Sequence, residues 1–371
     1  MASEFSLNSK LETQNSKLTN TMERRQFFKK TGLAGLAAGF SLPSMAGREK
    51  QVAAPALIKP AALEEGSTIA LIAPGSPIGD EKIKVATENM LKLGLVVKEG
   101  RNVRAKRGYF AGTDEQRLAD LHWAFSDPEI DGIWCLRGGY GCGRLLPNID
   151  YDLIRRNPKL LIGYSDITAL HLAIHSHTGL VTFHGPVAAS EYPDNTTNNA
   201  KAVLWQGKKG HVVSLPAESD ELPGPEYKPV VIAPGQAEGP LVGGNLALLS
   251  ALVGTAYSPS YRGKIVFIED IGEQPYRIDR MLIQLFQGTD LAQAAGIILG
   301  VFNDCQPKSG SIPSLSLEEA LHDNFAHLGI PVAYGFPFGH VPYNVTLPYG
   351  IMAALDTEQG TLTLLEGAVV K

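Results

Sequence analysis

The sequence predicts an α/β protein, with an N-terminal parallel-sheet domain that carries a nucleophile elbow and a smaller mixed α/β C-terminal domain. Three observations predict this fold class. Apolar strand-like runs alternate with helix-like segments in the first half of the chain. A stretch rich in proline, glycine and asparagine then interrupts them, and a second series of strands and helices follows it. At 371 residues, 44% hydrophobic and 19% charged, the chain is long enough for two domains.

The first element in order is a targeting segment, predicted over residues 1–46 as an export signal with an extension. Arg24-Arg25 precede a modestly apolar run at 31–42, and Ser44-Met45-Ala46 has small residues at both positions that a signal peptidase reads. This order resembles a twin-arginine export signal, and an amphipathic N-terminal helix is the alternative. We therefore expect a periplasmic protein with no stable membrane span after signal removal.

The N-terminal domain is predicted over residues 65–190, after a linker at 47–64. Each strand is followed by a turn and a helix, which is the pattern of a parallel sheet. A threonine or aspartate at 113–114 is expected to cap the second helix. The strands are expected at 68–73, 95–97, 132–136 and 160–163, and the helices at about 78–93, 113–127 and from 166 onward.

A second linker is predicted at 191–239, because this stretch is rich in turn formers, and the C-terminal domain follows at 240–371. Residues 243–249 are expected to form a turn that feeds a helix. The alternating runs near the C-terminus indicate a hairpin that closes a mixed sheet. The strands are expected at 264–268, 296–301, 351–355 and 361–365, and a helix at 276–286.

Ser165 is the candidate nucleophile. The apolar run 160–163 ends just before it, and a helix-like pattern starts directly after it. Such a strand-to-helix turn lifts a hydroxyl out of a sheet and points the first helix amides at a developing oxyanion. The alternative is that Ser165 merely caps the helix.

A glycine-rich loop at 136–144 follows a predicted strand. It does not fit a dinucleotide or phosphate-binding loop, because the third glycine and the lysine of those motifs are missing. Without Cβ atoms, Gly138 or Gly139 can bring a backbone N–H close to a substrate and supply half of an oxyanion hole. A plain tight turn is the alternative.

Two later segments contain the candidate acid and the candidate base of a catalytic triad. Glu269 and Asp270 stand at the carboxyl end of a predicted strand, where open α/β sheets place their sites, and either can orient a histidine. His340 lies in a rigid Gly/Pro-rich loop at 335–342 and is a plausible general base. A solvated strand end and a helix cap are the alternatives for the two carboxylates.

Several classes of function have little support. The net charge of −5 and the lack of a basic face argue against nucleic acid as a partner. His171 and His175 have i, i+4 spacing, but no metal motif surrounds them, so we predict no metal site. The three cysteines, Cys135, Cys142 and Cys305, allow at most one disulfide and leave at least one free thiol.

Taken together, the chain resembles the LD-carboxypeptidase family of muramoyltetrapeptide carboxypeptidases and microcin-immunity peptidases. The likeness covers roughly residues 65–366. The motifs that carry it are Arg137–Gly141, Gly163–Leu170, Gly243–Leu246, Ile268–Asp270 and Gly339-His340.

The resemblance implies a serine peptidase that needs no cofactor and removes a C-terminal D-amino acid, usually D-alanine, from murein tetrapeptides. It implies a triad of Ser165, His340 and Glu269. It also implies an oxyanion hole from the amide of Asp166 and an amide of Gly138 or Gly139. Family members are usually homodimers.

Two further substrate-binding residues are predicted. Arg137 is placed beside the oxyanion loop, so it is the candidate partner of the substrate carboxylate. Asn245 belongs to one of the motifs named above.

Two alternatives to murein peptide hydrolysis stay open. A microcin-immunity enzyme acting on aminoacyl-nucleotide conjugates would share the triad but need an aromatic platform for the base. A non-catalytic exported binding protein would need no such triad. The Gly-x-Ser-x-Gly elbow of lipases and esterases is absent, because Ile167 occupies its last position.

Overall fold

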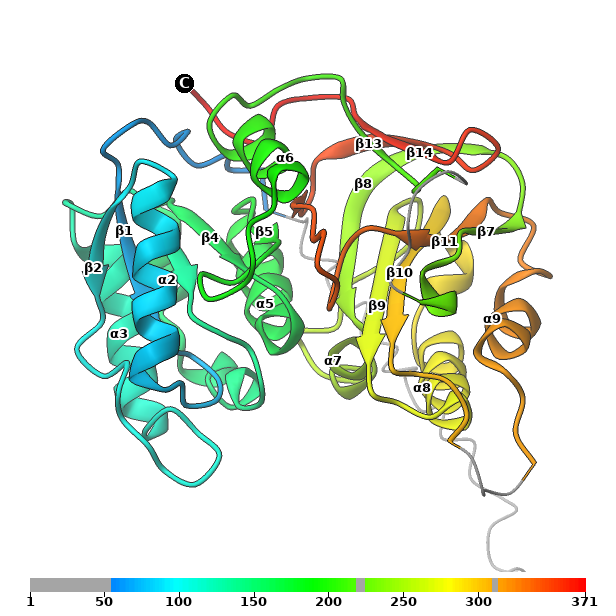
Figure 1. Cartoon of the computed structure of the whole chain (residues 1–371), viewed down its shortest axis with the longest axis horizontal. Helices are drawn as coiled ribbons and strands as arrows, with labels where there is room; N and C mark the ends of the chain where they lie inside the picture. Colours follow the sequence, from blue (N-terminus) through cyan, green and yellow to red (C-terminus); the bar gives the residue numbers. More distant parts are fainter. Residues whose placement is uncertain (1–54, 218–223, 309–312) are drawn as a thin grey trace, which may run out of the picture. The chain divides into compact units, whose positions relative to one another are not determined.

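A computed structural model describes residues 55–217, 224–308 and 313–371 of the chain (Figure 1). The predicted export signal lies outside the described residues. The described residues form one compact unit, which contains two β-sheets. We call them the N-terminal sheet and the C-terminal sheet.

The N-terminal sheet has six strands in the order β12-β5-β4-β3-β1-β2. The first five strands of the chain run parallel, and the two-residue β12 pairs antiparallel with β5. The order 2-1-3-4-5 is that of flavodoxin-like folds, in which the loops after β1 and β3 flank a crevice. The strands are β1 (Thr68–Ile72), β2 (Val96–Glu99), β3 (Gly132–Cys135), β4 (Leu160–Gly163), β5 (Phe183–His184) and β12 (Leu347–Pro348).

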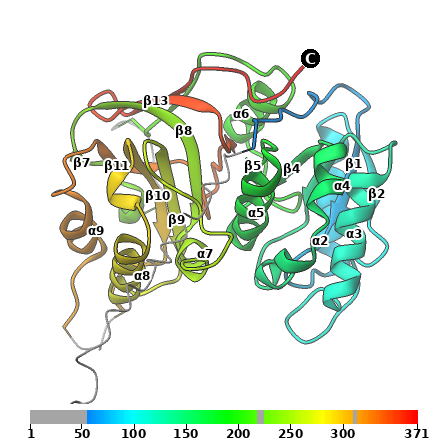
Figure 2. The ribbon, with the colours of Figure 1, turned by 180° about the vertical axis from the view of Figure 1, so that it is seen from behind.

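Helices cover both faces of this sheet, because the connections cross it in both directions. Helix α2 lies in front of the sheet in Figure 1, and α3 and α4 lie in front of it when the molecule is turned round in Figure 2. Thr113 caps α3 in a capping box with Gln116, as the sequence predicted. The helices are α2 (Asp80–Lys92), α3 (Asp114–Ser126), α4 (Tyr151–Arg156), α5 (Thr168–Thr178) and α6 (Asp194–Leu204).

The C-terminal sheet is mixed, with eight strands in the order β6-β14-β13-β8-β9-β10-β11-β7. Its central strands β8 to β11 are parallel and its outer pairings are antiparallel. The strands are β6 (His211–Ser214), β7 (Val230–Ala233), β8 (Gln236–Asn245), β9 (Ile265–Ile271), β10 (Gly296–Asn303), β11 (Val332–Phe336), β13 (Met352–Asp356) and β14 (Thr361–Leu364).

Three helices accompany the C-terminal sheet, and each packs against the next: α7 against α8, and α8 against α9. Apolar side chains such as Ile278, Leu282 and Leu285 of α8 are fully buried, at the i, i+4 and i+3 spacings of one helix face. The helices are α7 (Leu246–Ala251), α8 (Pro275–Gly288) and α9 (Leu317–Phe325).

The structure differs from the sequence predictions at three places. The predicted linker 191–239 contains α6, β6 and β7, and strands at its end already belong to the C-terminal sheet. The predicted linker 47–64 forms β-bridges at Ile58 and Ala61. The predicted turn at 243–245 is the end of β8, and α7 starts directly after it.

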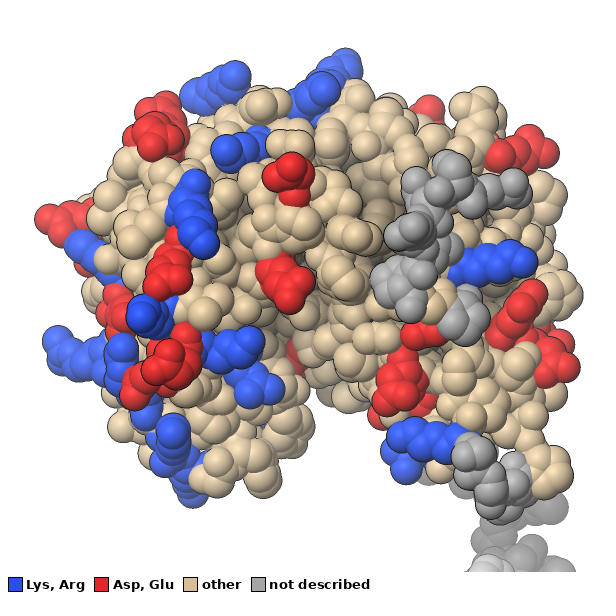
Figure 3. Space-filling model, viewed as in Figure 1, with Lys and Arg blue, Asp and Glu red and all other residues tan. Residues whose placement is uncertain are grey.

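The surface of the described chain carries both signs of charge side by side. Figure 3 shows Lys and Arg interspersed with Asp and Glu, and ion pairs such as Arg104–Asp80 and Lys59–Glu366 agree with this. No helix of the described residues has the length and apolar character needed to cross a membrane.

Candidate active site

Three loops meet at the carboxyl ends of β1, β3 and β4. These strands are neighbours in the sheet, so residues 74–77, 137–141 and 164–166 come together although they are far apart in sequence. Ser76 holds two of the loops together: its amide donates to the Gly138 carbonyl (3.0 Å), and its hydroxyl accepts from the Tyr140 amide (3.0 Å). The fold therefore gathers the predicted elbow and the glycine-rich loop.

Ser165 has the backbone of a nucleophile elbow. Its φ is +64°, a value that non-glycine residues rarely adopt. Its side chain caps neither the short 3₁₀ turn at Ser165–Ile167 nor α5. The alternative that Ser165 is a helix cap is therefore wrong, and the half-buried hydroxyl has no hydrogen-bond partner among the described residues.

Gly138 lies directly against the elbow. A Cβ atom at this position would stand 3.0 Å from the Tyr164 carbonyl oxygen and 3.1 Å from the Asp166 amide nitrogen. The Asp166 carboxylate is buried and accepts the Cys142 amide (2.8 Å), which ties the elbow to the same loop. The backbones of Gly138 and Asp166 therefore pack closely enough to leave no room for a side chain, which is the proximity that the predicted oxyanion hole requires.

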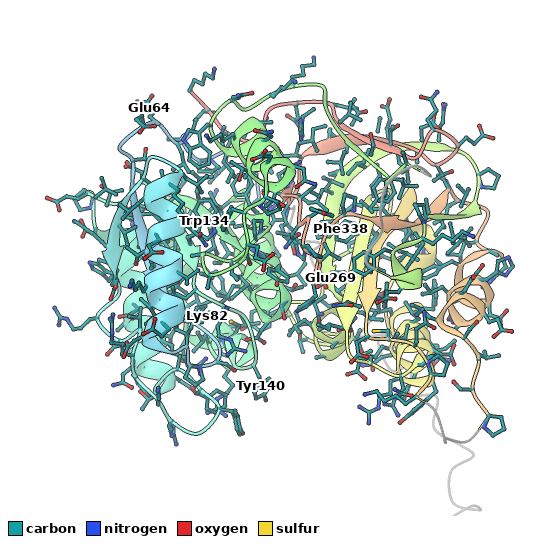
Figure 4. The ribbon with its side chains drawn as sticks, in the orientation of Figure 1. Glu64, Lys82, Trp134, Tyr140, Glu269 and Phe338 are labelled. Carbon is teal, nitrogen blue, oxygen red and sulfur yellow. The ribbon has the colours of Figure 1, made fainter. Side chains whose placement is uncertain are left out.

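The structure decides which carboxylate faces His340. His340 Nδ1 donates a hydrogen bond of 2.8 Å to Glu269 Oε2. The Glu269 side chain is fully buried, whereas that of His340 is 17% exposed. Glu269 lies on β9, two residues before the strand ends at Ile271, and Figure 4 labels its position.

Burial and charge act against each other in this pair. Burial alone would lower the pKa of His340, but the charge and hydrogen bond of Glu269 raise it above the usual value, with a smaller contribution from Asp270. Burial would raise the pKa of Glu269, but His340 lowers it below the usual value. The pair therefore favours a carboxylate beside an imidazole that readily takes a proton.

Asp270 and Asn245 form hydrogen bonds with each other and with the start of α7 instead of with His340. Asp270 accepts hydrogen bonds from Asn245 Nδ2 (3.0 Å) and from the Ala247 amide (3.0 Å). Asn245 also caps α7 by accepting the Leu248 amide, and it is 3% exposed. These contacts support the start of α7. The predicted substrate-binding residue Asn245 therefore has a buried side chain, and both its Oδ1 and its Nδ2 have a hydrogen-bond partner.

The His340 loop reaches the elbow through Tyr164. The rings of His340 and Tyr164 are 4.8 Å apart in an edge-on arrangement, and Tyr164 directly precedes Ser165. Asn303 Nδ2 donates to the His340 carbonyl (3.2 Å), and Asn344 accepts the Gly339 amide (3.1 Å). The loop of His340, the candidate base, is thus anchored by hydrogen bonds at Gly339 and at His340, and its ring contacts the residue that precedes Ser165.

Gly339 is needed for this arrangement. Its φ is +98°, and a Cβ atom there would stand 2.6 Å from Glu269 Oε2. No larger residue fits between the loop and the carboxylate without moving one of them.

Arg137 is exposed next to the glycine-rich loop, with one guanidinium nitrogen donating to the Pro77 carbonyl (3.2 Å). Its charge acts on Tyr164, whose pKa burial and Glu269 raise to about 12. Arg137 therefore stands at the surface near the elbow and does not turn into the core.

A groove of about 1040 Å³ adjoins the His340 loop without including the Ser165, Glu269 or His340 side chains. Residues of α6 and β6 line one side of it, and Pro337, Tyr343 and Val345 line the other. The segment predicted as a linker therefore shapes the surface beside the candidate base.

Other predicted residues have structural partners. His171 Nε2 donates to the Gly163 carbonyl (2.9 Å) and His175 Nδ1 to the Leu180 carbonyl (3.0 Å). Cys135, Cys142 and Cys305 are buried free thiols. Across the described ranges, no group of three or more His, Cys, Asp or Glu side chains has the arrangement of a metal site.

Sequence reasoning missed His184, a fully buried histidine at the end of β5. The signal that was available is a histidine at the end of the apolar run Leu180–Phe183, immediately before Gly185-Pro186.

Comparisons with known proteins agree on one family. Residues 69–185 match the LD-carboxypeptidase N-terminal domain, and residues 238–355 match the LD-carboxypeptidase C-terminal domain. The chain is 44% identical over 311 residues to a probable murein peptide carboxypeptidase of Bacillus subtilis, covering 83% of this chain and 95% of that one.

Two further similarities extend this result. The chain is 38% identical over 296 residues to the murein tetrapeptide carboxypeptidase of Pseudomonas aeruginosa, which covers 78% of this chain and 92% of the relative. The solved structure of the microcin C7 self-immunity protein MccF in its apo state aligns with a TM-score of 0.75 at 27% identity, over 84% of this chain and 100% of that one.

Proposed function

Because the chain belongs to the LD-carboxypeptidase family and is a carboxypeptidase, we propose that it removes the terminal D-alanine from murein tetrapeptides with Ser165, His340 and Glu269 as its triad. The main support for the proposed triad is the 2.8 Å hydrogen bond from His340 to the buried Glu269. In addition, the ring of His340 contacts Tyr164, the residue before Ser165. The names of the murein peptide relatives support the substrate.

The proposed reaction begins at Ser165. Its Oγ attacks the carbonyl carbon of the amide bond between an L-configured centre and the terminal D-alanine, and His340 Nε2 takes the hydroxyl proton. Glu269 stabilises the imidazolium through Nδ1–H. The C–N bond then breaks, Nε2 gives its proton to the leaving amine, and water hydrolyses the acyl-enzyme by the same route.

The developing negative charge needs fixed donors. We assign the amide of Asp166 and an amide of Gly138 or Gly139 to this role. Neither glycine amide has a hydrogen-bond partner among the described residues, and a Cβ atom on Gly138 would lie 3.1 Å from the Asp166 amide nitrogen.

A carboxypeptidase also recognises the free carboxylate of its substrate, and Arg137 is the proposed partner. A guanidinium can bind a carboxylate through two parallel hydrogen bonds. Arg137→Gln is expected to raise KM about tenfold or more for a tetrapeptide with a free C-terminus. An unchanged KM would exclude Arg137. Arg144→Gln is the matched control, since Arg144 is exposed nearby but paired with Asp114.

The function itself is tested with paired substrates. The full chain is incubated with murein tetrapeptides that end in D-alanine or in L-alanine, and tripeptide and free alanine are measured by mass spectrometry. We expect release from the D-alanine substrate only. Equal release from both, or from neither, would contradict the proposal.

A microcin-immunity activity is the second candidate, favoured by the similarity to MccF. Such an enzyme would cleave an aminoacyl-nucleotide conjugate with the same serine. Incubation with aspartyl sulfamoyl adenosine, a compound bound to MccF in a solved structure, separates the two candidates. Cleavage of this compound without tetrapeptide cleavage would replace our first proposal.

We also propose that the enzyme is exported to the periplasm by the twin-arginine route, loses residues 1–46 and acts there as a homodimer on peptidoglycan peptides of the cell wall. The arginine pair in the sequence supports the route. Replacing Arg24 and Arg25 by lysine should retain the protein in the cytoplasm in a fractionation experiment, and periplasmic protein in that variant would exclude this route.

A further inference from the structure

The loop at residues 74–77, between β1 and α2, has no part in the mechanism above, although it lies against both segments of the proposed oxyanion hole. A Cβ atom on Gly75 would stand 2.5 Å from the Gly138 carbonyl oxygen and 2.9 Å from the Asp166 carboxylate. The backbone of this loop therefore packs against the glycine-rich loop and against the elbow at once.

Two hydrogen bonds hold the loop at its start. The Pro74 carbonyl accepts a hydrogen bond from the guanidinium of Arg117, whose side chain is fully buried and also pairs with Asp114. The Gly75 carbonyl accepts the amide of Ala111 (2.9 Å). A buried guanidinium with two partners has little freedom to move, so the loop is a fixed support for the residues that it contacts.

Ser76 bonds the peptide units on both sides of Gly139. Its amide donates to the carbonyl of Gly138 (3.0 Å), which belongs to the unit before Gly139. Its hydroxyl accepts the amide of Tyr140 (3.0 Å), which belongs to the unit after Gly139. A side chain on Gly139, whose φ is +93°, would collide with the Ser76 hydroxyl. One serine thus sets the orientation of two successive peptide planes.

These bonds distinguish the two glycine amides that can serve an oxyanion. The C=O and N–H of a trans peptide unit point in opposite directions, so the Gly139 N–H points away from Ser76 while Ser76 holds the Gly138 carbonyl. The Gly138 N–H belongs to the preceding unit, whose carbonyl, that of Arg137, accepts no hydrogen bond from a described residue. An oxyanion donor is effective when its direction is fixed before the reaction, which favours Gly139.

The fixed peptide unit is also close to the nucleophile. A Cβ atom on Gly138 would stand 3.1 Å from Ser165 Cβ and 3.1 Å from the Asp166 amide nitrogen. The unit that Ser76 orients therefore starts at the residue that packs against the elbow.

We propose that Ser76 is a positioning residue of the oxyanion hole, which holds the Gly139 amide as the donor that acts beside the amide of Asp166. Ser76 acts through the two peptide planes and not through contact with the substrate. Loss of its hydroxyl should weaken binding of the transition state more than binding of the substrate. This inference rests on the proposed function, because it requires a tetrahedral intermediate at Ser165.

The test compares Ser76→Ala with the parent in the full chain. Both receive the D-alanine tetrapeptide and a boronic acid analogue of this peptide, which forms a tetrahedral adduct with a nucleophilic serine. We expect kcat to fall about tenfold with KM little changed, and the affinity for the boronic acid to fall by a similar factor. The acidic limb of kcat/KM should stay in place, because the bond between His340 and Glu269 is retained.

Two further variants accompany Ser76→Ala. Ser250→Ala is the matched control, since Ser250 is a buried serine that bonds to Gln284 of α8, and it should leave both kcat and boronic acid affinity unchanged. Gly139→Ala displaces the Ser76 hydroxyl with its methyl group and should show the pattern of Ser76→Ala. In the double variant the two losses should add up to less than their sum, because both act on the same contact.

Three outcomes would overturn the role of Ser76 in an active parent. They are an unchanged kcat in folded Ser76→Ala, a fall in kcat without a fall in boronic acid affinity, and a shift of the acidic limb. A parent that releases no D-alanine would instead overturn the proposed function, and this inference with it.

Discussion

At the scale of single residues, Glu269 controls the protonation of His340. Because Glu269 raises the pKa of His340 above the usual 6.5, protonated His340 persists to higher pH than a free histidine. A general base must be neutral, so activity is expected to fall as the pH drops through this raised value.

The pH dependence of kcat/KM tests this role of Glu269. The acidic limb of kcat/KM should lie above pH 6.5 in the parent enzyme. Glu269→Gln removes the carboxylate charge that raises the pKa of His340, whereas the burial of His340, which lowers this pKa, remains. The acidic limb should therefore move to lower pH, and kcat should fall about 10³–10⁴-fold. A limb that does not move, in the kcat/KM profile of D-alanine release, would exclude Glu269 as the partner.

Residue patterns alone left Glu269 and Asp270 equivalent, because both end the same predicted strand. Successive strand residues point to opposite faces, so only one of them can meet His340. Nothing in the local sequence says which face the His340 loop covers. Ser165 and His340 could be selected as candidates from the sequence because each has an unusual local context: a strand-to-helix turn for Ser165 and a rigid apolar loop for His340.

At the scale of elements, the site depends on loops that end parallel strands. The loop after β11 approaches β9 at Gly339, where a side chain would collide with Glu269. The addition of a single methyl group at Gly339 therefore tests this contact.

Gly339→Ala is expected to lower kcat at least about a hundredfold, because the methyl group must displace either the loop or the carboxylate. Gly329→Ala is the matched control: its φ of +70° carries a similar backbone cost of about 1–2 kcal/mol, but nothing lies within 4 Å of the added atom. Both variants are compared by thermal unfolding and by D-alanine release. Similar activities in the two would show that the close contact is unimportant.

The alternating elements were predictable at this scale, and the exceptions have physical causes. Strand β8 contains Gly239, Pro240, Gly243 and Gly244, which have low strand propensity, yet its pairing with β9 and β13 holds it extended. The region 191–239 looks like a linker because its short strands gain their stability from distant partners such as β14 and β11.

At the scale of the whole molecule, a buried hydrogen bond joins the helix that follows Ser165 to the strand beside Glu269. The backbone amide of Asn245, at the end of β8, donates a hydrogen bond of 3.0 Å to Thr168 Oγ1 at the start of α5. Thr168 begins the helix that follows Ser165, and Asn245 is in register with Glu269. The bond therefore links the nucleophile helix to the strand beside the acid.

Thr168→Val keeps the shape of this contact but leaves the Asn245 amide unpaired. We expect a loss of about 1–3 kcal/mol in unfolding free energy, since a buried donor is left unsatisfied. We also expect a lower kcat, because the two parts of the triad are then less well aligned. Thr87→Val is the control, since Thr87 bonds only within α2. Denaturant unfolding and D-alanine release by both variants test this, and a stable Thr168→Val with full activity would contradict it.

The proposed mechanism depends above all on Ser165 as the nucleophile. The most direct measurement incubates the parent protein and Ser165→Ala with murein tetrapeptide and follows free D-alanine by mass spectrometry. We predict release by the parent and none above background by the folded variant. Release by Ser165→Ala at the parent's rate would contradict the assignment of Ser165, and no release by either protein would contradict the proposed substrate.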